Sequence, residues 1–521
     1  MLRFVAFGAF VALAFLACAD SGDGGGGAGL DAGPPPAPTI APLTETPPTT
    51  VDKTLVPKTA RVDPSTTKNP SFPDVLAGML EQGFGELGAG SGDAYVTRTL
   101  DDSTPPPPGP NAKRLTRFVH LADLQIADDE TPTRLGNFDS PGLTSSALRP
   151  QDPYLCRMGN AAVRTINALH AKDPIDFTVT GGDNADNAQV NEVDWVLGFL
   201  SGSPSVKCDS GDDTDLVPGP ANDPKDAFAA EGLAMPWWWV TGNHDILVQG
   251  NFDIALRNSV AIGTDASGGT RNYRDGKPGT VESGNFVVPD PRRALLSRKD
   301  LMAKVGADKD GHGIGAKEKE TGRATYTFDV EGTPLRFLIL DTAHETGGAE
   351  GVITRRHVDD HIKEMLDTAK RDGKFVILSS HHAATSLSKG DGLGGSPEPD
   401  ALLTQDWADF IGNYDNVVFS MVGHSHRHRV QAVRATNGHA YWEVMTAAIA
   451  DYPHQFRIAE IYDQDNGWLM LRATGVDIAV EGDEVAEEGR RRGVVDFTSG
   501  WLPVDDVTAK DKNVEVWVKK P

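Results

Sequence analysis

The sequence predicts an α/β protein built on layered sheets, and three observations carry this prediction. Short apolar runs recur along the chain, and each ends in glycine or polar residues, as buried strands do. Segments with apolar residues at helical spacing lie between several of these runs. Alternation of strand, helix and strand is typical of α/β folds. The 521 residues fit two to four domains or one elaborated domain with extensions.

The first 18 residues have the pattern of an export signal. Arg3 gives a positive start, residues 4–17 are apolar, and small residues surround Cys18. Phe15-Leu16-Ala17-Cys18 resembles the bacterial lipoprotein box, with Phe15 where leucine is usual. We therefore expect an exported protein held at the bacterial cell envelope by lipid on Cys18, its only membrane contact. Ordinary signal cleavage is the alternative.

Two segments precede the main domain. Residues 19–50 are rich in Gly, Pro, Ala and Thr, so we expect a disordered tether that forms no core. Residues 51–112 contain one apolar segment and end in a stiff run of prolines, Pro105 to Pro108. We interpret them as an N-terminal extension that packs on the main domain.

The main domain is expected over residues 113–476, with strands that each lead into a polar cluster. The predicted strands are Phe118–Ala122, Phe177–Thr180, Pro236–Val240, Phe375–Leu378 and Val417–Val422. Helical spacing of apolar residues marks 155–169 and 358–369. Farther on, residues 456–462 and 468–473 form strands joined through Asp465-Asn466-Gly467, a good hairpin turn. This change of character predicts a second, more antiparallel sheet beside the first.

Two regions give weaker signals. Residues 271–323 have little periodicity and more basic than acidic residues, which is typical of a solvated surface insertion. Residues 477–521 are expected to be a C-terminal extension whose role the sequence does not show. With Cys18 acylated, Cys156 and Cys208 remain, and an even pair in an oxidising compartment favours a disulfide over two separate thiols.

The charge of the chain limits its partners. A formal net charge of -25 would repel polyanions, so we expect no binding to nucleic acid or anionic lipid. A small phosphorylated substrate remains compatible with this charge because its binding depends on local groups. The oligomeric state is left open.

Five polar clusters at the predicted strand ends indicate a metal centre. They are Asp123-Leu124-Gln125, Gly182-Asp183-Asn184, Gly242-Asn243-His244-Asp245, His381-His382 and Gly423-His424-Ser425-His426. Ligand sites of α/β sheets lie at such strand ends. Carboxylate, amide oxygen and imidazole suit Fe, Mn or Zn, whereas Ca²⁺ would demand more oxygen ligands. One histidine at a strand end is usually a core residue, but five such clusters favour two metal ions.

These clusters resemble the motifs of the calcineurin-like metallophosphoesterase superfamily, in order and in residue type. The resemblance covers about Arg117 to Val476, and a less specific match points to a bacterial subfamily of unassigned substrate. It implies a two-sheet αββα sandwich with two divalent or mixed-valence ions. It also implies that Asp123, Asp183 and His426 hold the first metal. Asp183 would bridge to a second metal held by Asn243, His381 and His424.

The resemblance also assigns roles beside the metals. His244 would lie beside the metals without ligating and either protonate the leaving oxygen or hydrogen-bond the phosphoryl group, and Asp245 would orient its ring. His381 is preferred over His382 as the ligand. Gln125 stands where many members have a first-metal histidine, so this position departs from the pattern. Its amide oxygen is a candidate ligand that water could replace.

Other polar residues have weaker claims. Asn184 and Asn187 are candidate substrate contacts, although asparagines after a strand are commonly turn formers. Arg292 and Arg293 could clamp phosphate oxygens, or simply lie on the surface. His428 fits an ordinary loop residue better than an extra ligand.

The expected function is metal-dependent hydrolysis of phosphate monoesters or diesters, with a hydroxide held between the metals as nucleophile. One alternative is a surface binding protein on the same fold with weakened catalysis. Another is a mononuclear metallohydrolase in which only the second site fills.

Overall fold

Two β-sheets packed face to face form the centre of the computed structural model, which describes residues 37–142, 144–211, 214–503 and 507–521. The expected signal segment, Cys18 and most of the tether lie outside the described residues. Aromatic rings from both sheets meet between them. The ring centres of Phe118 and Phe337 lie 5.1 Å apart, and those of Phe177 and Phe328 lie 5.3 Å apart, both in edge-to-face contact. The mixed α/β class predicted from the sequence is confirmed.

The larger sheet has seven strands in the order β3-β19-β18-β17-β4-β5-β8. β4, β5 and β8 run parallel, whereas β17 pairs antiparallel with β4 and β18. The bounds are β3 Val96–Thr99, β4 Lys113–Leu121, β5 Phe177–Thr180, β8 Trp237–Trp238, β17 Gln455–Asp463, β18 Trp468–Asp477 and β19 Val514–Lys519.

The smaller sheet has six strands in the order β11-β12-β13-β14-β16-β15. Its four central strands are parallel, and β11 and β15 are antiparallel edges. The bounds are β11 Tyr326–Asp329, β12 Leu335–Leu340, β13 Phe375–Ser380, β14 Val417–Val422, β15 Arg429–Arg434 and β16 Ala440–Met445.

The allocation of strands to sheets corrects one expectation. We expected the C-terminal hairpin to belong to a separate antiparallel sheet, but β17 and β18 extend the sheet that contains β4 and β5. The strands before His381 and His424 belong instead to the smaller sheet. Pairing between β17 and β4 joins segments more than 300 residues apart in the sequence. A local sequence pattern cannot predict such a contact.

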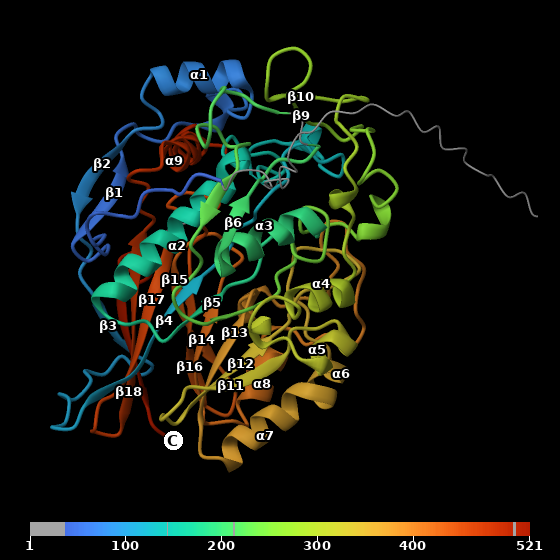
Figure 1. Cartoon of the computed structure of the whole chain (residues 1–521). Helices are drawn as coiled ribbons and strands as arrows, with labels where there is room; N and C mark the ends of the chain where they lie inside the picture. The colour runs from blue at the N-terminus through green and yellow to red at the C-terminus, as the bar shows by residue number, and fades with distance from the viewer. Residues whose placement is uncertain (1–36, 143, 212–213, 504–506) are drawn as a thin grey trace, which may run out of the picture. The chain divides into compact units, whose positions relative to one another are not determined.

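Helices cover the outer faces of the two sheets (Figure 1). α2 and α3 bury apolar residues with the larger sheet, and α7 and α8 with the smaller one. α7 turns Leu366 and Ala369 inward, and the preceding π-helical turn, 358–362, does the same with Ile362. The bounds are α2 Leu155–Lys172, α3 Val190–Ser201, α6 Arg355–His357, α7 Lys363–Arg371 and α8 Thr404–Ile411. No helix among the described residues is long and apolar enough to cross a membrane.

The segments outside the expected main domain are integrated with it. β19 lies between β3 and β18, so both flanking segments supply strands to the larger sheet. The C-terminal helix α9, Glu484–Thr498, packs Val495 against Leu76 and Met79 of α1, Pro73–Glu81. The N-terminal strands β1 (Lys53–Pro57) and β2 (Leu87–Ser91) pair with each other.

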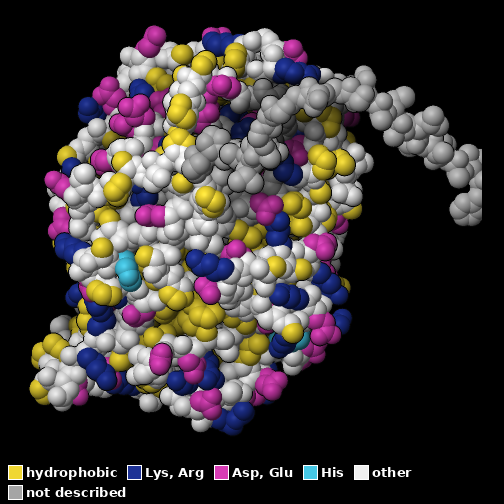
Figure 2. All heavy atoms as spheres, in the orientation of Figure 1, with side chains coloured by type: hydrophobic (Ala, Val, Ile, Leu, Met, Phe, Trp, Pro, Cys, Tyr) yellow, Lys and Arg dark blue, Asp and Glu magenta, His cyan; other side chains and the backbone are white. Residues whose placement is uncertain are grey.

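The region expected to be a surface insertion is partly buried. It forms β9 (Thr270–Asn272), β10 (Thr280–Glu282), α4 (Arg298–Val305) and α5 (Ala316–Thr321). α4 places Leu301, Met302 and Val305 in the main core. Acidic and basic side chains are interspersed over the face that Figure 2 shows.

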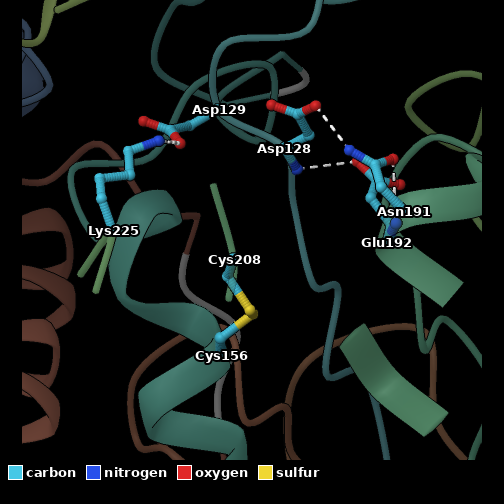
Figure 3. The surroundings of a disulfide bond; sticks show 7 residues. All are labelled: Asp128, Asp129, Cys156, Asn191, Glu192, Cys208 and Lys225. Carbon is cyan, nitrogen blue, oxygen red and sulfur yellow. Dashed lines mark hydrogen bonds and ion pairs between the residues drawn. A yellow bond between two sulfur atoms is a disulfide. The ribbon is translucent and has the colours of Figure 1, made fainter. Parts of the chain in front are cut away.

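The predicted disulfide between Cys156 and Cys208 is confirmed (Figure 3). It ties α2 to the segment that follows the short strand β6, Ser203–Val206, which pairs with β7, Phe228–Ala230. The same segment carries the buried Lys225, whose ammonium group donates to Asp129 at 2.7 Å. The bridge joins residues separated by 52 positions, a loop whose closure removes about 4 kcal/mol of chain entropy from the unfolded state in the simple model.

Candidate metal centre

The five polar clusters meet where the carboxyl ends of the parallel strands of both sheets come together. The loops after β4 and β5 are joined by a hydrogen bond from the Asp123 amide to the Gly182 carbonyl, 3.1 Å. The loops after β13 and β14 are joined by one from the Gly423 amide to the His381 carbonyl, 2.9 Å. The larger sheet thus supplies Asp123, Asp183 and Asn243, and the smaller sheet supplies the histidines. The histidines are His381, His424 and His426, and we call these three residues together with Asp123, Asp183 and Asn243 the metal cluster.

Short distances connect the carboxylates and imidazoles of the metal cluster. His381 Nε2 lies 3.0 Å from Asp183 Oδ2 and 3.9 Å from Asp123 Oδ1. His426 Nε2 lies 3.4 Å from Asp123 Oδ1. Potential ligand atoms of Asp123, Asp183 and His381 lie within 4.8 Å of one another. This spacing is compatible with donor atoms that converge on shared cations.

Two buried atoms of the metal cluster have no hydrogen-bond partner, and both suit a metal ion. The Asn243 amide donates from Nδ2 to the Gly250 carbonyl at 2.9 Å, which leaves Oδ1 buried and unpartnered. His381 contacts the Gly181 carbonyl through Nδ1, and its Nε2 is likewise buried and makes no hydrogen bond, although Asp183 Oδ2 lies 3.0 Å away. Buried polar atoms are rarely left unsatisfied, so these atoms fit the ligand role that the sequence assigns.

The electrostatics of the metal cluster also favour a bound cation. Burial opposes protonation of His381 and His426, yet nearby carboxylates raise the pKa of His381 to about 9 and that of His426 to about 10. Asp183 is the main carboxylate that acts on His381, and Asp123 and Asp451 are those that act on His426. Burial, together with the charge of His381, lowers the pKa of His424 to about 3. A cation would take over the charge that protons on His381 and His426 otherwise supply.

Five residues of these loops adopt left-handed backbone, which is uncommon for residues other than glycine. They are Asp123, Gln125, Asp183, His424 and His426, with φ between 42° and 75°. Such strain persists where the surrounding structure fixes it, and it often accompanies function. A glycine allows a related close approach, since a Cβ on Gly242 would lie 2.1 Å from Asp183 Oδ1.

Gln125 is held in an orientation that does not suit ligation. Its Oε1 accepts a hydrogen bond from Arg149 Nη2 at 2.6 Å, and its Nε2 lies 3.5 Å from Asp183 Oδ2. A guanidinium only donates, so the amide oxygen must face Arg149, and the amide nitrogen left toward Asp183 cannot bind a metal. The expected ligand role of Gln125 therefore has no support in this arrangement.

His244 has the position expected for an acid beside the metals, but a different carboxylate holds it. Its Nδ1 contacts Asp186 Oδ1 at 3.0 Å, and its Nε2 lies 4.0 Å from Asp183 Oδ2. We expected Asp245 to orient this ring. Asp245 instead accepts backbone N–H groups of Gly242 and Asn184 and so fixes the loops that carry the metal cluster. Its pKa rises to about 7 because of burial and the charge of Asp183.

The remaining candidates make hydrogen bonds to the loops around the metal cluster. His382 contacts Thr342 Oγ1 and the Ala349 carbonyl through its two ring nitrogens, which leaves His381 as the better ligand. His428 contacts Gln455. Asn184 donates to Val240 and Asp245, and Asn187 to Asp186 and Glu192.

The two arginines considered as phosphate clamps pair with carboxylates elsewhere. Arg292 contacts Asp290, and the buried Arg293 contacts Asp128 at 3.0 Å. Neither is among the residues that line the cavity over the metal cluster. The arrangement gives no support to the expected clamp.

Sequence reasoning missed two buried supports. Asp451 accepts from His426 Nδ1 at 2.5 Å, and Arg149 Nε contacts the other Asp451 oxygen at 2.9 Å. Arg149, 1 % exposed, thus connects Gln125 to the carboxylate that orients His426. Neither residue belongs to a polar cluster at a predicted strand end, so the chain carries no local signal for them. Asp186, which contacts His244, was also missed, although the chain carries a local signal for it, since it follows Asp183 by three positions in the same loop.

A two-sheet α/β sandwich with helices outside and ligand-bearing loops from both sheets is the arrangement that the resemblance to metallophosphoesterases implies. No protein-family model and no curated protein matches the chain. Among solved structures, it is similar to a dimetal phosphatase from Danio rerio, with 13% identity, a TM-score of 0.38, and coverage of 70% of this chain and 100% of that one.

Two further solved structures have partial likeness. A purple acid phosphatase from yellow lupin has 14% identity and a TM-score of 0.30, covering 74% of this chain and 54% of that one. A sulfate thiohydrolase from Thermus thermophilus has 12% identity and a TM-score of 0.30, covering 74% and 60%.

Proposed function

We propose that this protein is a metal-dependent hydrolase of phosphate monoesters or diesters. The observation that carries the proposal is the pair of unpartnered buried atoms, Asn243 Oδ1 and His381 Nε2, beside the carboxylates of Asp123 and Asp183. Asp123, Asp183 and His426 would hold one ion, and Asp183, Asn243, His381 and His424 the other. When bound, the two ions supply positive charge that activates water and neutralises the phosphoryl oxygens.

In the proposed reaction, the oxygen of a water molecule bonds to phosphorus as the bond from phosphorus to the alcohol oxygen breaks. The alcohol oxygen needs a proton as it leaves, and His244 is the donor that the geometry favours. Its Nδ1 is held by Asp186, and its side chain lines the cavity over the metal cluster. The proton passes from Nε2 to the alcohol, the proton that the attacking water loses goes to solvent, and solvent later reprotonates Nε2.

A mononuclear enzyme is the second candidate, and the arrangement of Gln125 favours it. With the Gln125 oxygen on Arg149, the first site retains only Asp123, Asp183 and His426. Metal content of active protein distinguishes the two candidates. Two ions per chain support the dinuclear centre, and one ion with full activity supports the other.

We also propose that the protein acts outside the cytoplasm and that a lipid on Cys18 anchors it to the membrane. The disulfide between Cys156 and Cys208 supports an oxidising compartment, because such bonds rarely persist where glutathione keeps thiols reduced.

Substitution of the proposed bridging carboxylate tests the function. We expect Asp183→Asn to lower kcat on an active ester by at least about 1000-fold, because the charge shared by both sites is removed. Elemental analysis should show loss of metal in the same protein. Asp139→Asn is the matched control, since it makes the same change outside the metal cluster. Equal activity of Asp183→Asn and the parent would contradict the proposal.

A further inference from the structure

The cavity over the metal cluster is much larger than a phosphoryl group requires. Its volume is about 890 Å³, and its lining includes His244 and Arg149 together with four members of the metal cluster, Asp183, Asn243, His424 and His426. Cavities of this size bind whole small molecules of drug-like dimensions. Most of the space is therefore available to the alcohol part of an ester whose phosphorus lies at the metal cluster.

Several residues of the lining are apolar, and we call this set the apolar wall. It consists of Leu55, Val56, Tyr452, Phe497, Leu502 and Val507. These residues come from β1, from the loop between β16 and β17, and from the end of α9 and the segment after it. Regions of the chain that are distant in sequence thus build one face of the cavity.

Direct contacts hold the apolar wall together. The rings of Tyr452 and Phe497 lie 4.4 Å apart, and the Tyr452 hydroxyl donates to the Leu55 carbonyl at 3.3 Å. Arg61 donates to the Leu502 carbonyl at 2.7 Å, which anchors the segment after α9. The apolar wall is also continuous with the metal cluster, because Tyr452 directly follows Asp451, the residue that orients His426.

Two polar residues that line the cavity with the apolar wall, Lys512 and Asn513, are held by internal partners. The Lys512 ammonium group lies 3.0 Å from Asp93, so an acidic side chain already neutralises its charge. The Asn513 side chain accepts from Thr50 and donates to the Asp93 carbonyl. This pairing disfavours an alcohol that carries a second anionic group, and it leaves hydrocarbon as the better complement.

Two members of the apolar wall remain exposed to water. Val56 is 42 % exposed and Val507 is 38 % exposed. Covering such side chains with hydrocarbon releases water from both surfaces and is favourable in proportion to the area covered. An apolar alcohol would gain this stabilisation, whereas a short or strongly hydrated alcohol would not.

We propose that the substrate is a phosphate ester of a hydrocarbon-bearing alcohol, whose alkyl chain lies on the apolar wall while the phosphoryl group lies at the metal cluster. This inference rests on the proposed hydrolase function and names its substrate class. With metal ions bound, both parts of such an amphiphile would have a complement in the same cavity, cationic at one side and apolar at the other.

A chain-length series tests the inference on the full, Mn²⁺-loaded protein. The substrates are methyl, butyl and octyl p-nitrophenyl phosphate diesters and the phosphate monoesters of the same three alcohols. We expect kcat/KM to rise by about threefold for each added methylene until the apolar wall is covered. A p-nitrophenyl ester of thymidine 5′-phosphate serves as the polar comparison and should be a poorer substrate than the octyl diester.

Variants locate the effect on the apolar wall. Val56→Ser and Val507→Ser should each lower the ratio of octyl to methyl kcat/KM by about threefold to tenfold, and the ratio is internal to each protein. Leu256→Ser is the matched control, because Leu256 is 65 % exposed and does not line the cavity. Its octyl to methyl ratio should equal that of the parent.

Binding provides a readout that needs no turnover. Octylphosphonate should bind more tightly than methylphosphonate by calorimetry, and Val56→Ser should reduce the difference. Equal kcat/KM for all chain lengths, or preference for the thymidine ester, would overturn the substrate class and leave the hydrolase function intact. Absence of turnover for every ester would overturn the proposed function, and the substrate assignment with it.

Discussion

Asp186 and Asp245, the two carboxylates considered as supports of His244, have different partners, and this difference separates their roles. Asp186 contacts the ring at Nδ1 and also accepts from the buried Arg134 at 3.0 Å. Asp245 contacts only backbone groups and the Asn184 amide among the hydrogen bonds of the described chain. We therefore interpret Asp186 as a positioning residue for His244.

Asp186→Asn is expected to lower kcat by about 10- to 100-fold on an alkyl ester, because the ring of His244 loses its anionic partner. A p-nitrophenyl monoester should be affected much less, since p-nitrophenolate leaves without a proton. Steady-state kinetics on both esters measures this difference. His244→Ala should show the same dependence on the leaving group.

Asp245→Asn is the matched control for this prediction. It should lower metal content and the turnover of both esters together, because Asp245 fixes the loops that carry Asp183 and Asn243. If Asp186→Asn slows both esters equally, the role assigned to Asp186 is wrong.

At the scale of single residues, the sequence predicts those ligands that come directly after strands. Asp123, Asp183 and Asn243 follow predicted strands, the family resemblance assigns them as ligands, and the structure brings them to one place. Partners such as Asp451 and Arg149 come from other loops, and only the folded chain places them beside His426. The sequence also shows no sign that Arg149 takes the amide oxygen of Gln125.

At the scale of elements, strands with a clear turn signal are predicted well. The hairpin of β17 and β18 is confirmed, with Asp463 opposite Leu469 across the turn. β8 is shorter than expected, two residues instead of five, because it pairs with β5 only at Trp237 and Trp238. Partner choice between strands depends on long-range contacts, so the division into two sheets could not be predicted locally.

The short helix α6 contains a buried histidine that should make stability depend on pH. His357 is 7 % exposed, and its Nε2 lies 3.1 Å from Thr325 Oγ1. Burial, with the charge of Arg323, lowers its pKa to about 3, although Asp341 opposes this and His361 adds to it. The folded protein thus holds the neutral ring.

The pKa of His357 in the folded state lies below its unfolded value. The contribution of His357 to the free energy of unfolding is therefore fully present above about pH 6.5 and decreases as the pH falls toward the folded pKa. Near pH 5 the unfolded state binds a proton that the folded state does not, which costs about 2 kcal/mol. Urea unfolding at pH 7.5 and 5.0 should therefore show a smaller pH effect in His357→Gln than in the parent.

His361→Gln is the control for this pH effect. The ring of His361 keeps part of its contact with solvent, and burial lowers its pKa by less than that of His357. Its free energy of unfolding should change with pH nearly as in the parent. An unchanged pH effect in His357→Gln would contradict the assignment to His357.

At the scale of the whole molecule, the larger sheet depends on both ends of the described chain. β19 pairs with β18 over six residues and with β3 over four, so it lies inside the sheet. The Trp442 indole of β16 also donates to the Trp517 carbonyl of β19 at 3.1 Å, which connects the two sheets. The expected boundary at residue 476 therefore cuts through the core.

A chain that ends at residue 476 should fail to fold. It would lose β19 and α9, and with them the buried side chains of Val514, Val516 and Val518. Burial of these three valines alone contributes about 5–9 kcal/mol, which is comparable to the roughly 5–15 kcal/mol that stabilises a typical folded protein. Circular dichroism and urea unfolding should show no cooperative transition.

A chain of residues 37–521 is the control, because it keeps the described contacts and should unfold at the midpoint of the full chain. A cooperative transition at that midpoint in the chain ending at 476 would mean that the sheet does not need its C-terminal strand.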